Sequence, residues 1–423
     1  MTESTEFIEK AVIISVIRKG SDRAISDEHL DELEFLVQTA GAEIIERFVQ
    51  ELAKPNSSTL VGSGKAEEIK EYIKENSANL AIFDDDLSPV QVRNLEKILE
   101  VKVIDRSGLI LDIFAKHART NEAKTQVELA QLQYVMPRLT RMWTHLSKQF
   151  GGIGTKGPGE TQIETDRRAI KQRIQMLKEK LDDITRNKEV QRKNRSSFPR
   201  FSLVGYTNAG KSTLMNVLTD AGVYVENKLF ATLDTTVRQF TMPAGMSALL
   251  SDTVGFIRKL PTHLIASFRS TLAEAAEADV IVHVVDVSHP FFRDQIKVVE
   301  ETLESLKIKN KPTILVLNKI DLIEDYIGIN AIKQEFDKSI FVSAKRHINI
   351  QALLEKFQDV YNEQSKEIKF ILPYNRMDMI AMLYKCAEII TKNEGDDGIE
   401  FSVRVQPDDL DFFNNKFGGF IKK

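Results

Sequence analysis

The chain contains a single cysteine, Cys386, among 423 residues. One cysteine excludes a disulfide framework and any metal centre built from several thiolates, and its apolar neighbours predict a buried side chain. No stretch approaches the roughly 18 uncharged apolar residues of a membrane-spanning helix. The first six residues are acidic rather than basic. We therefore expect the chain to have neither a signal peptide nor a membrane-spanning helix.

An excess of charge of one sign is also missing. The chain has 58 Lys and Arg against 62 Asp and Glu, a net charge of -4. Such a balance does not mark a protein that binds nucleic acid over its whole surface, so any RNA contact must come from local basic patches. The length of 423 residues and the 42% share of hydrophobic residues suffice for two to four domains with real cores.

A phosphate-binding motif is present near the middle of the chain. Residues 205–212 read Gly-Tyr-Thr-Asn-Ala-Gly-Lys-Ser and follow the short apolar run 201–204. The glycines allow consecutive backbone N–H groups to point at a di- or triphosphate, and a helix predicted over 213–219 directs its dipole there. We expect Lys211 to reach the outer phosphates and Ser212 to bind Mg²⁺. An ordinary glycine turn is disfavoured because strand, loop and helix are all in place.

Four further patterns follow in an order that chance would not produce. They are Phe230-Ala231-Thr232-Leu233-Asp234, Asp252-Thr253-Val254-Gly255, Asn318-Lys319-Ile320-Asp321 and Ser343-Ala344-Lys345. The first lies in a Thr-rich connection suited to a switch loop. The others follow apolar strands, at the sheet edge where open α/β folds bind ligands.

The third and fourth patterns predict the base. Guanine presents N1–H and N2–H₂ donors, and the Asp321 carboxylate can accept from both, while Asn318 and the backbone N–H of Ala344 can serve the N7 and O6 acceptors. Adenine would leave these groups unpaired, which costs roughly 1–3 kcal/mol for each buried group. The sequence therefore predicts a GTP or GDP site. Its predicted members are Gly205, Tyr206, Thr207, Asn208, Ala209, Gly210, Lys211, Ser212, Thr213, Phe230, Ala231, Thr232, Leu233, Asp234, Asp252, Thr253, Val254, Gly255, Asn318, Lys319, Ile320, Asp321, Ser343, Ala344 and Lys345.

Residues 1–108 alternate strand and helix patterns and predict an independent βαβαβαβ domain. Within it, Gly62-Ser63-Gly64-Lys65 resembles a second phosphate loop, but Ala66 replaces Ser or Thr, so we interpret it as a glycine turn that opens a helix. The run Asp84-Asp85-Asp86 fits either a metal cluster or the cap region of the next helix, and the cap is favoured.

Residues 109–195 are helical in pattern and predict an antiparallel hairpin of two long helices. The connection, residues 151–160, is rich in glycine and is flanked by Arg141, Trp143, Lys148 and Phe150. A basic, glycine-rich tip with nearby aromatic rings suits insertion into structured RNA. Packing of this loop on the chain's own GTPase domain is the alternative. Residues 196–362 form the predicted GTPase domain.

Residues 363–423 predict a small α+β domain with the order βαβα. Strands are expected over 368–372 and 401–405, a helix over 377–390, a turn over 393–398 and a short helix over 407–415. Its residues indicate no catalytic or binding role.

The segment from Gly154 to Arg168, Gly-Thr-Lys-Gly-Pro-Gly-Glu-Thr-Gln-Ile-Glu-Thr-Asp-Arg-Arg, resembles the signature of the HflX family of GTPases. The P-loop, the switch segments and residues 267–272 resemble that family too, so the match covers residues 10 to about 360. The resemblance implies a multidomain α/β protein that hydrolyses GTP, binds the large ribosomal subunit and helps to split or rescue stalled ribosomes. It further implies a cytoplasmic protein, with peripheral membrane association as a variant, that is monomeric off the ribosome. Thr235 stands where the family usually has Pro.

The expected mechanism is a switch driven by GTP hydrolysis. Mg²⁺ is held by Ser212 and Thr232, where the resemblance favours Thr232 over Thr235 and Thr236, and by Asp252 through water. Gly255 detects the γ-phosphate through its N–H, and Lys211 contacts the phosphates. Asn208 either helps to hold K⁺ beside the β–γ bridging oxygen or braces the loop. A membrane-linked or tRNA-modifying GTPase, or an RNA-binding module with a structural nucleotide pocket, are the alternative functions.

Overall fold

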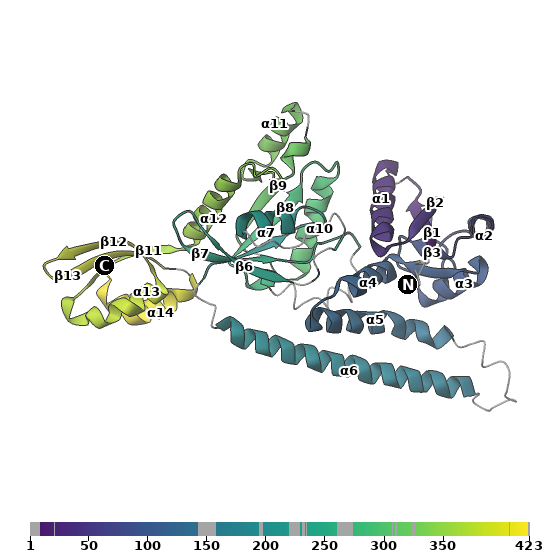
Figure 1. The fold of residues 1–423 in the computed structure, drawn as a ribbon, viewed down its shortest axis with the longest axis horizontal. Helices are drawn as coiled ribbons and strands as arrows, with labels where there is room; N and C mark the ends of the chain where they lie inside the picture. The colour runs from purple at the N-terminus through teal and green to yellow at the C-terminus, as the bar shows by residue number, and fades with distance from the viewer. Residues whose placement is uncertain are drawn as a thin grey trace, which may run out of the picture. The chain divides into compact units, whose positions relative to one another are not determined.

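The structure is a computed structural model that describes residues 9–20, 22–142, 158–193, 198–219, 229–230, 233, 235–259, 274–306, 308, 311–323, 326–405 and 407–421. The chain divides into two compact units, whose elements are labelled in Figure 1. The first unit draws on residues 1–187, 226–234 and 257–272, and the second on residues 188–225, 235–256 and 273–423. The Thr-rich segment and the residues after Phe256 thus belong to the first unit, although the sequence places them among the GTPase motifs.

A four-stranded parallel sheet forms the centre of the first unit. Its strand order is β2-β1-β3-β4. The strands are β1 (Lys10–Arg18), β2 (Glu43–Leu52), β3 (Leu80–Phe83) and β4 (Lys102–Asp105), and the helices are α1 (Arg23–Ala40), α2 (Ser63–Glu75), α3 (Pro89–Leu99) and α4 (Arg106–His117). This succession confirms the predicted βαβαβαβ unit. From β1 the chain first adds β2 on one side and then β3 and β4 on the other side. The carboxyl ends of β1 and β3 therefore flank the position where doubly wound sheets bind ligands.

Alternating burial explains why this sheet has helices on both faces. Val12 and Ile14 of β1 pack in a core with Ile69 of α2 and Leu95 of α3. Successive strand residues point to opposite faces, and α1 and α4 contact each other and the sheet from the other side. Gly62 is the N-cap of α2, which confirms a glycine turn that opens a helix.

A helical hairpin completes the first unit. Helix α5 (Asn121–Met142) and helix α6 (Pro158–Lys193) lie side by side, and the Arg173 guanidinium of α6 bonds to Glu128 of α5 through both carboxylate oxygens, at 2.6 and 3.0 Å (Figure 1). Glu128 lies 14 residues before the end of α5 and Arg173 lies 15 residues after the start of α6, so the helices run antiparallel, as predicted. The helical pattern of residues 109–149 is not one helix, however. Helix α4 ends at His117 and α5 begins at Asn121. The buried α4 packs against the sheet rather than forming part of the hairpin.

The second unit is built on a six-stranded sheet with the order β10-β9-β8-β5-β7-β6, in which only the β6–β7 pair is antiparallel. Its strands are β5 (Arg200–Val204), β6 (Thr236–Thr241), β7 (Ser247–Asp252), β8 (Val280–Asp286), β9 (Thr313–Asn318) and β10 (Ile340–Phe341). The described helices include α7 (Lys211–Thr219), α10 (Phe292–Ser305), the short 3₁₀ helix η1 (Ile320–Leu322), α11 (Tyr326–Glu335) and α12 (Ile350–Gln364).

Helices cover both faces of this sheet. Val282 and Val284 of β8 share a core with Leu214 of α7 and Phe357 of α12. Val285, one residue further on, points to the opposite core, with Phe292 of α10. Because parallel strands end at one edge, this double cover places the turns after β5, β7, β8 and β9 together. That edge carries the predicted nucleotide motifs.

The C-terminal part of the second unit is a three-stranded antiparallel sheet, β11-β13-β12, with helices packed on it. The elements are β11 (Lys366–Leu372), η2 (Tyr374–Met379), α13 (Ile380–Cys386), β12 (Glu388–Gly395), β13 (Gly398–Val405), α14 (Pro407–Phe417) and η3 (Gly418–Phe420). Cys386 is 5% exposed in this core, as predicted.

The helix predicted over 377–390 is wrong in its second half. Helix α13 ends at Cys386, and residues 388–395 form β12, so the order is βαββα rather than βαβα. The run Ile389-Ile390-Thr391 is β-branched, and pairing with β13 satisfies its backbone, which outweighs the helical continuation of the apolar spacing. The division into four domains stays a prediction. Among the described residues no helix is both long and apolar enough to cross a bilayer.

Candidate nucleotide-binding site

The P-loop connects β5 to α7, as predicted, and its glycines are required by close approach. A Cβ on Gly205, whose φ is +153°, would lie 2.1 Å from the Val284 carbonyl oxygen. A Cβ on Gly210, whose φ is +94°, would lie 2.3 Å from the Asn318 Nδ2. Asn208 also has a positive φ, of 60°, and its side chain is exposed. Asn and Gly tolerate this region best, so the loop's shape accounts for these residue types.

The Lys211 ammonium lies inside the loop. It donates to the carbonyl oxygens of Gly205 at 3.1 Å and Tyr206 at 2.8 Å, and the residue is 6% exposed. Burial lowers the pKa of Lys211 to about 8, against the opposing effect of the Asp252 carboxylate. Among the described residues, the Lys211 ammonium donates to carbonyl oxygens rather than to a carboxylate. Lys211 is thus placed to bind a phosphate oxygen.

Ser212 and Asp252 come together from different elements. The Ser212 hydroxyl at the start of α7 donates to Asp252 Oδ2, at the end of β7, over 2.6 Å. Asp252 is fully buried. A hydroxyl and a carboxylate at this separation are hard oxygen ligands of the type that Mg²⁺ prefers, one directly and one through water. The residues present therefore fit a Mg²⁺ ion, although its third predicted ligand, Thr232, lies outside the described residues.

The segment after Asp252 lies against the P-loop. The Thr207 N–H donates to the Phe256 carbonyl at 2.7 Å, and the Phe256 N–H donates to the Gly205 carbonyl at 3.0 Å. Gly255 leaves no room for a side chain, because a Cβ there would lie 2.8 Å from Thr207 Cγ2 and 3.0 Å from Lys211 Nζ. Gly255 is thus held beside the Lys211 side chain.

Asn318 ties the base-binding loops to the P-loop. Its Nδ2 donates to the Ala209 carbonyl at 2.9 Å, and its Oδ1 accepts from the Ala344 N–H at 3.0 Å. Asp321 Oδ1 accepts from the Ser343 hydroxyl at 2.6 Å. The structure therefore brings Asn318, Asp321, Ser343 and Ala344 together. Asn318 acts here as a brace, a role that the sequence analysis did not assign to it.

Asp286 was not among the site residues predicted from the sequence. This residue ends β8, pairs in register with Asn318, and forms an ion pair of 2.7 Å with the Lys319 ammonium. A signal was available, because Asp286 follows an apolar strand in the same way as Asp252 and Asn318 do. It lacked a recognised motif around it.

The predicted switch segment is only partly described. Ala231, Thr232 and Asp234 lie outside the described residues. Phe230 and Leu233 are buried in the first unit, at 3% and 2% exposure, and the Phe230 ring meets the Phe114 ring of α4 edge-on at 4.6 Å. Phe230 has a φ of +55°, a strained conformation for an aromatic residue. These two side chains act as core residues there.

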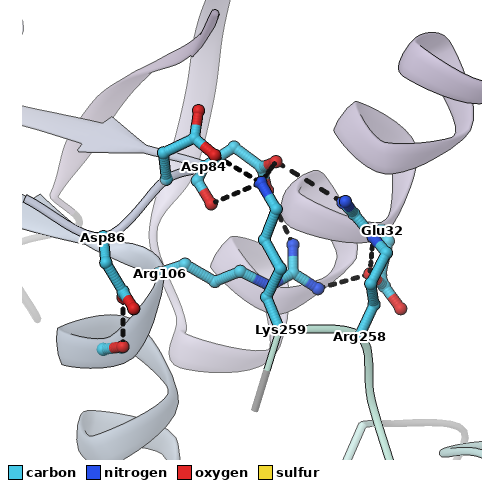
Figure 2. Close-up of polar contacts among 8 residues, drawn as sticks. Glu32, Asp84, Asp86, Arg106, Arg258 and Lys259 are labelled. Carbon is cyan, nitrogen blue, oxygen red and sulfur yellow. Dashed lines mark hydrogen bonds and ion pairs between the residues drawn. The ribbon is translucent and has the colours of Figure 1, made fainter. Parts of the chain in front are cut away.

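Arg258 and Lys259, which follow Phe256 in the chain, join an ion-pair cluster at the carboxyl edge of the first unit's sheet (Figure 2). Asp84 accepts from Arg106 at 2.7 Å, from Lys259 at 3.0 Å and from Arg258 at 3.4 Å. Glu32 pairs with Arg106 as well. Burial by itself raises the pKa of the Asp84 carboxyl, but the charges of Arg106, Lys259 and Arg258 hold it well below its usual value.

This arrangement revises the two interpretations of Asp84-Asp85-Asp86. Within the described part of the chain, no group of three or more His, Cys, Asp or Glu residues could hold a metal ion. The N-cap of α3 is Ser88, which forms a capping box with Gln91, so the aspartates do not cap that helix. Asp84 is instead the carboxylate partner of three cationic side chains.

The predicted RNA-binding tip lies outside the described residues: this holds for the glycine-rich connection, Trp143, Lys148 and Lys156, and for the Arg141 side chain. The adjoining turns of α6 are described, and Arg167, Arg168 and Lys171 are exposed there. An exposed basic helix surface therefore continues the hairpin beyond the tip.

Comparison with known proteins defines the class. Residues 200–319 match the family model of the 50S ribosome-binding GTPase, and the geometry above belongs to that segment, so the second unit contains a P-loop GTPase domain. Residues 27–115 match the GTP-binding GTPase N-terminal model and residues 117–195 the GTP-binding GTPase middle region.

The particular family follows from whole-chain relatives. The chain is 48% identical over 365 residues to the GTPase HflX of Flavobacterium psychrophilum, covering 86% of this chain and 87% of that protein. It is 41% identical over 382 residues to the GTPase HflX of Escherichia coli, covering 89% and 90%. This protein belongs to the HflX family of GTPases, which confirms the resemblance read from the sequence. A solved GTP-binding protein of Sulfolobus solfataricus in complex with GDP is 24% identical, with a TM-score of 0.44 and coverage of 84% of this chain and 98% of that one.

Proposed function

We propose that this GTPase binds the large ribosomal subunit and uses GTP binding and hydrolysis as a switch in splitting or rescuing stalled ribosomes. The match of residues 200–319 to a 50S ribosome-binding GTPase model supports the partner. One structural observation supports the proposal that the nucleotide site acts as a switch. The Thr207 N–H of the P-loop donates to the Phe256 carbonyl at 2.7 Å, so a phosphate oxygen in the loop and the segment 252–256 compete for this donor.

The nucleotide's phosphates are bound by the P-loop N–H groups and the Lys211 ammonium. Ser212, Thr232 and Asp252 are the residues that would hold Mg²⁺, which would supply positive charge to the phosphates. The 2.6 Å contact between Ser212 and Asp252 supports this assignment. Asp321 accepts from the guanine N1–H and N2–H₂ donors.

Gly255 is the residue that senses the γ-phosphate. Its Cα lies against Thr207 and Lys211 so tightly that no Cβ fits. A γ-phosphate bound by Lys211 lies close to Gly255, whose N–H can donate to it and order the segment. Release of the phosphate removes this hydrogen bond and lets the segment relax. The two arrangements are the two states of the switch.

The helical hairpin is the proposed contact with ribosomal RNA. Arg141, Lys148 and Lys156 flank the glycine-rich tip, and the exposed Arg167, Arg168 and Lys171 continue the basic surface along α6. Each phosphate contact of a Lys or Arg releases counterions, so the binding depends on salt concentration.

Two measurements test the proposal. The first is phosphate release with and without ribosomes. Ribosomes should increase it if the nucleotide site is a switch, and an unchanged rate would instead favour an RNA-binding module whose pocket only maintains its shape.

The second is co-sedimentation with ribosomes across a salt series. The triple variant Arg141→Ala, Lys148→Ala, Lys156→Ala should bind more weakly and with a shallower salt dependence, while its GDP affinity stays unchanged. The matched control removes three positive charges from α2 of the same unit, Lys65→Ala, Lys70→Ala and Lys74→Ala. Equal binding of the wild type and the hairpin variant would contradict the RNA contact and favour packing of the loop on the protein itself.

A further inference from the structure

Asp286 is held with both carboxylate oxygens engaged at the edge of the nucleotide site. Its Oδ2 lies 2.7 Å from the Lys319 ammonium. Its Oδ1 accepts from the Ser288 N–H at 3.1 Å and from the Ser288 hydroxyl at 2.5 Å. The Asp286 side chain is 16% exposed and that of Lys319 is 24% exposed. A carboxylate fixed on both sides and largely shielded from water is a rigid anchor for the ammonium.

The backbone around Lys319 makes its direction depend on this anchor. Lys319 has a φ of +65° and a ψ of 32°, which lie in the left-handed region. This conformation is unfavourable for any residue that has a Cβ atom. It lies between Asn318, which bridges Ala209 and Ala344, and the turn that carries Asp321. The Val287 N–H donates to the Asn318 carbonyl at 3.0 Å, so residues 286–288 are fastened to residues 318–319 by backbone as well.

We propose that Asp286 is a positioning residue for the guanine site, acting through Lys319. By holding the ammonium at the end of β8, it fixes the four-carbon stem of Lys319 between the two residues that flank it, Asn318 and Ile320. Apolar stems of lysine pack on flat apolar surfaces while the charge stays in a polar environment. The flat surface offered beside Asn318 and Asp321 is the face of the purine ring. Asp286 thereby sets the affinity for the base without touching it.

This inference rests on the proposed nucleotide site, and it makes a distinct prediction. Every guanine nucleotide has the same base, so loss of the anchor weakens GDP and a GTP analogue by the same factor. The rate of the chemical step at the phosphates is unaffected. A purely structural role for Asp286, as a link between the ends of β8 and β9, would weaken the fold instead.

The test is a double-mutant cycle on the dissociation rate of fluorescent GDP from the full chain. Asp286→Asn and Lys319→Met should each increase the rate about tenfold, the factor that corresponds to one charge-assisted contact. In the Lys319→Met background, Asp286→Asn should add nothing further, because its effect passes through the missing ammonium. Multiplying effects, or no effect of Asp286→Asn, would overturn the proposal. Ser288→Ala, which frees Oδ1 without changing charge, provides a milder variant and should increase the rate in the same direction.

Two controls separate this inference from the site itself. Glu335→Gln removes the carboxylate of a comparable pair, the 2.6 Å contact of Arg293 and Glu335, which is exposed, and should leave the rate unchanged. Asp321→Asn should abolish tight GDP binding. Retention of GDP by Asp321→Asn would refute the nucleotide site and this inference with it. Loss of GDP in Asp321→Asn together with an unchanged rate in Asp286→Asn would refute only the role of Asp286.

Discussion

Asp321 is exposed, and its Oδ1 accepts from the Ser343 hydroxyl at 2.6 Å. The same hydroxyl accepts from the Arg346 N–H at 3.0 Å, so Ser343 holds the carboxylate in place. A carboxylate held this way has acceptor capacity left for two N–H donors of a base. Base specificity therefore depends on the acceptor oxygens of one side chain, whose orientation is set by Ser343.

Asp321→Asn should shift the preference from guanine to xanthine nucleotides. The amide NH₂ presents a donor where guanine needs an acceptor, and xanthine has a carbonyl in place of the N2–H₂ group. Competition between GDP and XDP for the variant measures this. The Ser343 hydroxyl can also donate to an amide oxygen, so the fold should persist. GDP binding as tight as in the wild type would show that Asp321 does not read the base.

Phe256 occupies the position at which Ras-like GTPases have a glutamine that orients the attacking water. Its ring is buried at 2% exposure and cannot hydrogen-bond water. We therefore expect slow hydrolysis by the isolated protein, with help from a partner or a cation. Asn208, with its exposed side chain on the P-loop, is the candidate ligand of K⁺.

Turnover in KCl against NaCl, with and without ribosomes, measures the contribution of the cation. A K⁺ ion beside the β–γ bridging oxygen stabilises the negative charge that develops there, so KCl should give the faster rate. Equal rates in both salts would leave Asn208 as a brace of the loop. Fast hydrolysis without ribosomes or K⁺ would contradict the argument from Phe256.

At the scale of elements, helix α4 organises the first unit. Its first residue, Arg106, is 1% exposed and pairs with Asp84 and Glu32, and Phe114 near its end meets Phe230. Glu32 lies on α1, Asp84 follows β3, and Arg258 and Lys259 follow Phe256 in the chain (Figure 2). One ion-pair cluster therefore fastens several elements together.

Asp84→Asn should lower the free energy of unfolding of the first unit by about 3 kcal/mol, because it removes the buried carboxylate that Arg106, Arg258 and Lys259 share, while Glu32 still pairs with Arg106. Urea unfolding followed by circular dichroism measures the change. The control is Asp85→Asn, which removes only a partner of Lys259, at 2.5 Å on a side chain that is 32% exposed. The control should cost less than about 1 kcal/mol. Equal losses in the two variants would contradict the special role of Asp84.

For the whole molecule, the buried His283 and the half-buried His29 contribute to the stability at mildly acidic pH. Burial, with the nearby charge of Lys211, lowers the pKa of His283 from 6.5 to about 4. Burial, with the charge of Arg258, lowers the pKa of His29 to about 4 as well. A lowered folded-state pKa means that the unfolded chain binds protons more readily, so both residues favour the folded state at pH above 6.5, and this contribution decreases as the pH falls.

The loss should develop between pH 6.5 and about pH 4 and level off below that value. For the fully buried His283 it amounts to about 3 kcal/mol. The urea midpoint of the second unit measured from pH 7.5 to 4.5 should decrease, and His283→Asn should flatten this dependence. A midpoint that is constant over the range would contradict a neutral buried His283.

The nucleotide motifs, the βαβαβαβ unit, the helical hairpin and the family could be predicted from the sequence, because each is encoded locally. A P-loop needs glycine where a Cβ would collide with Val284, and strands and helices carry their own periods. Contacts between residues far apart in the chain could not be predicted in this way. Asp286 reaches Lys319 only because β8 and β9 are neighbours, and Asp84 meets Lys259 across 175 positions. Residues 388–395 became a strand because β13 offered them hydrogen bonds. Spacing along the chain records local preference, whereas pairing energies arise only after the chain has folded.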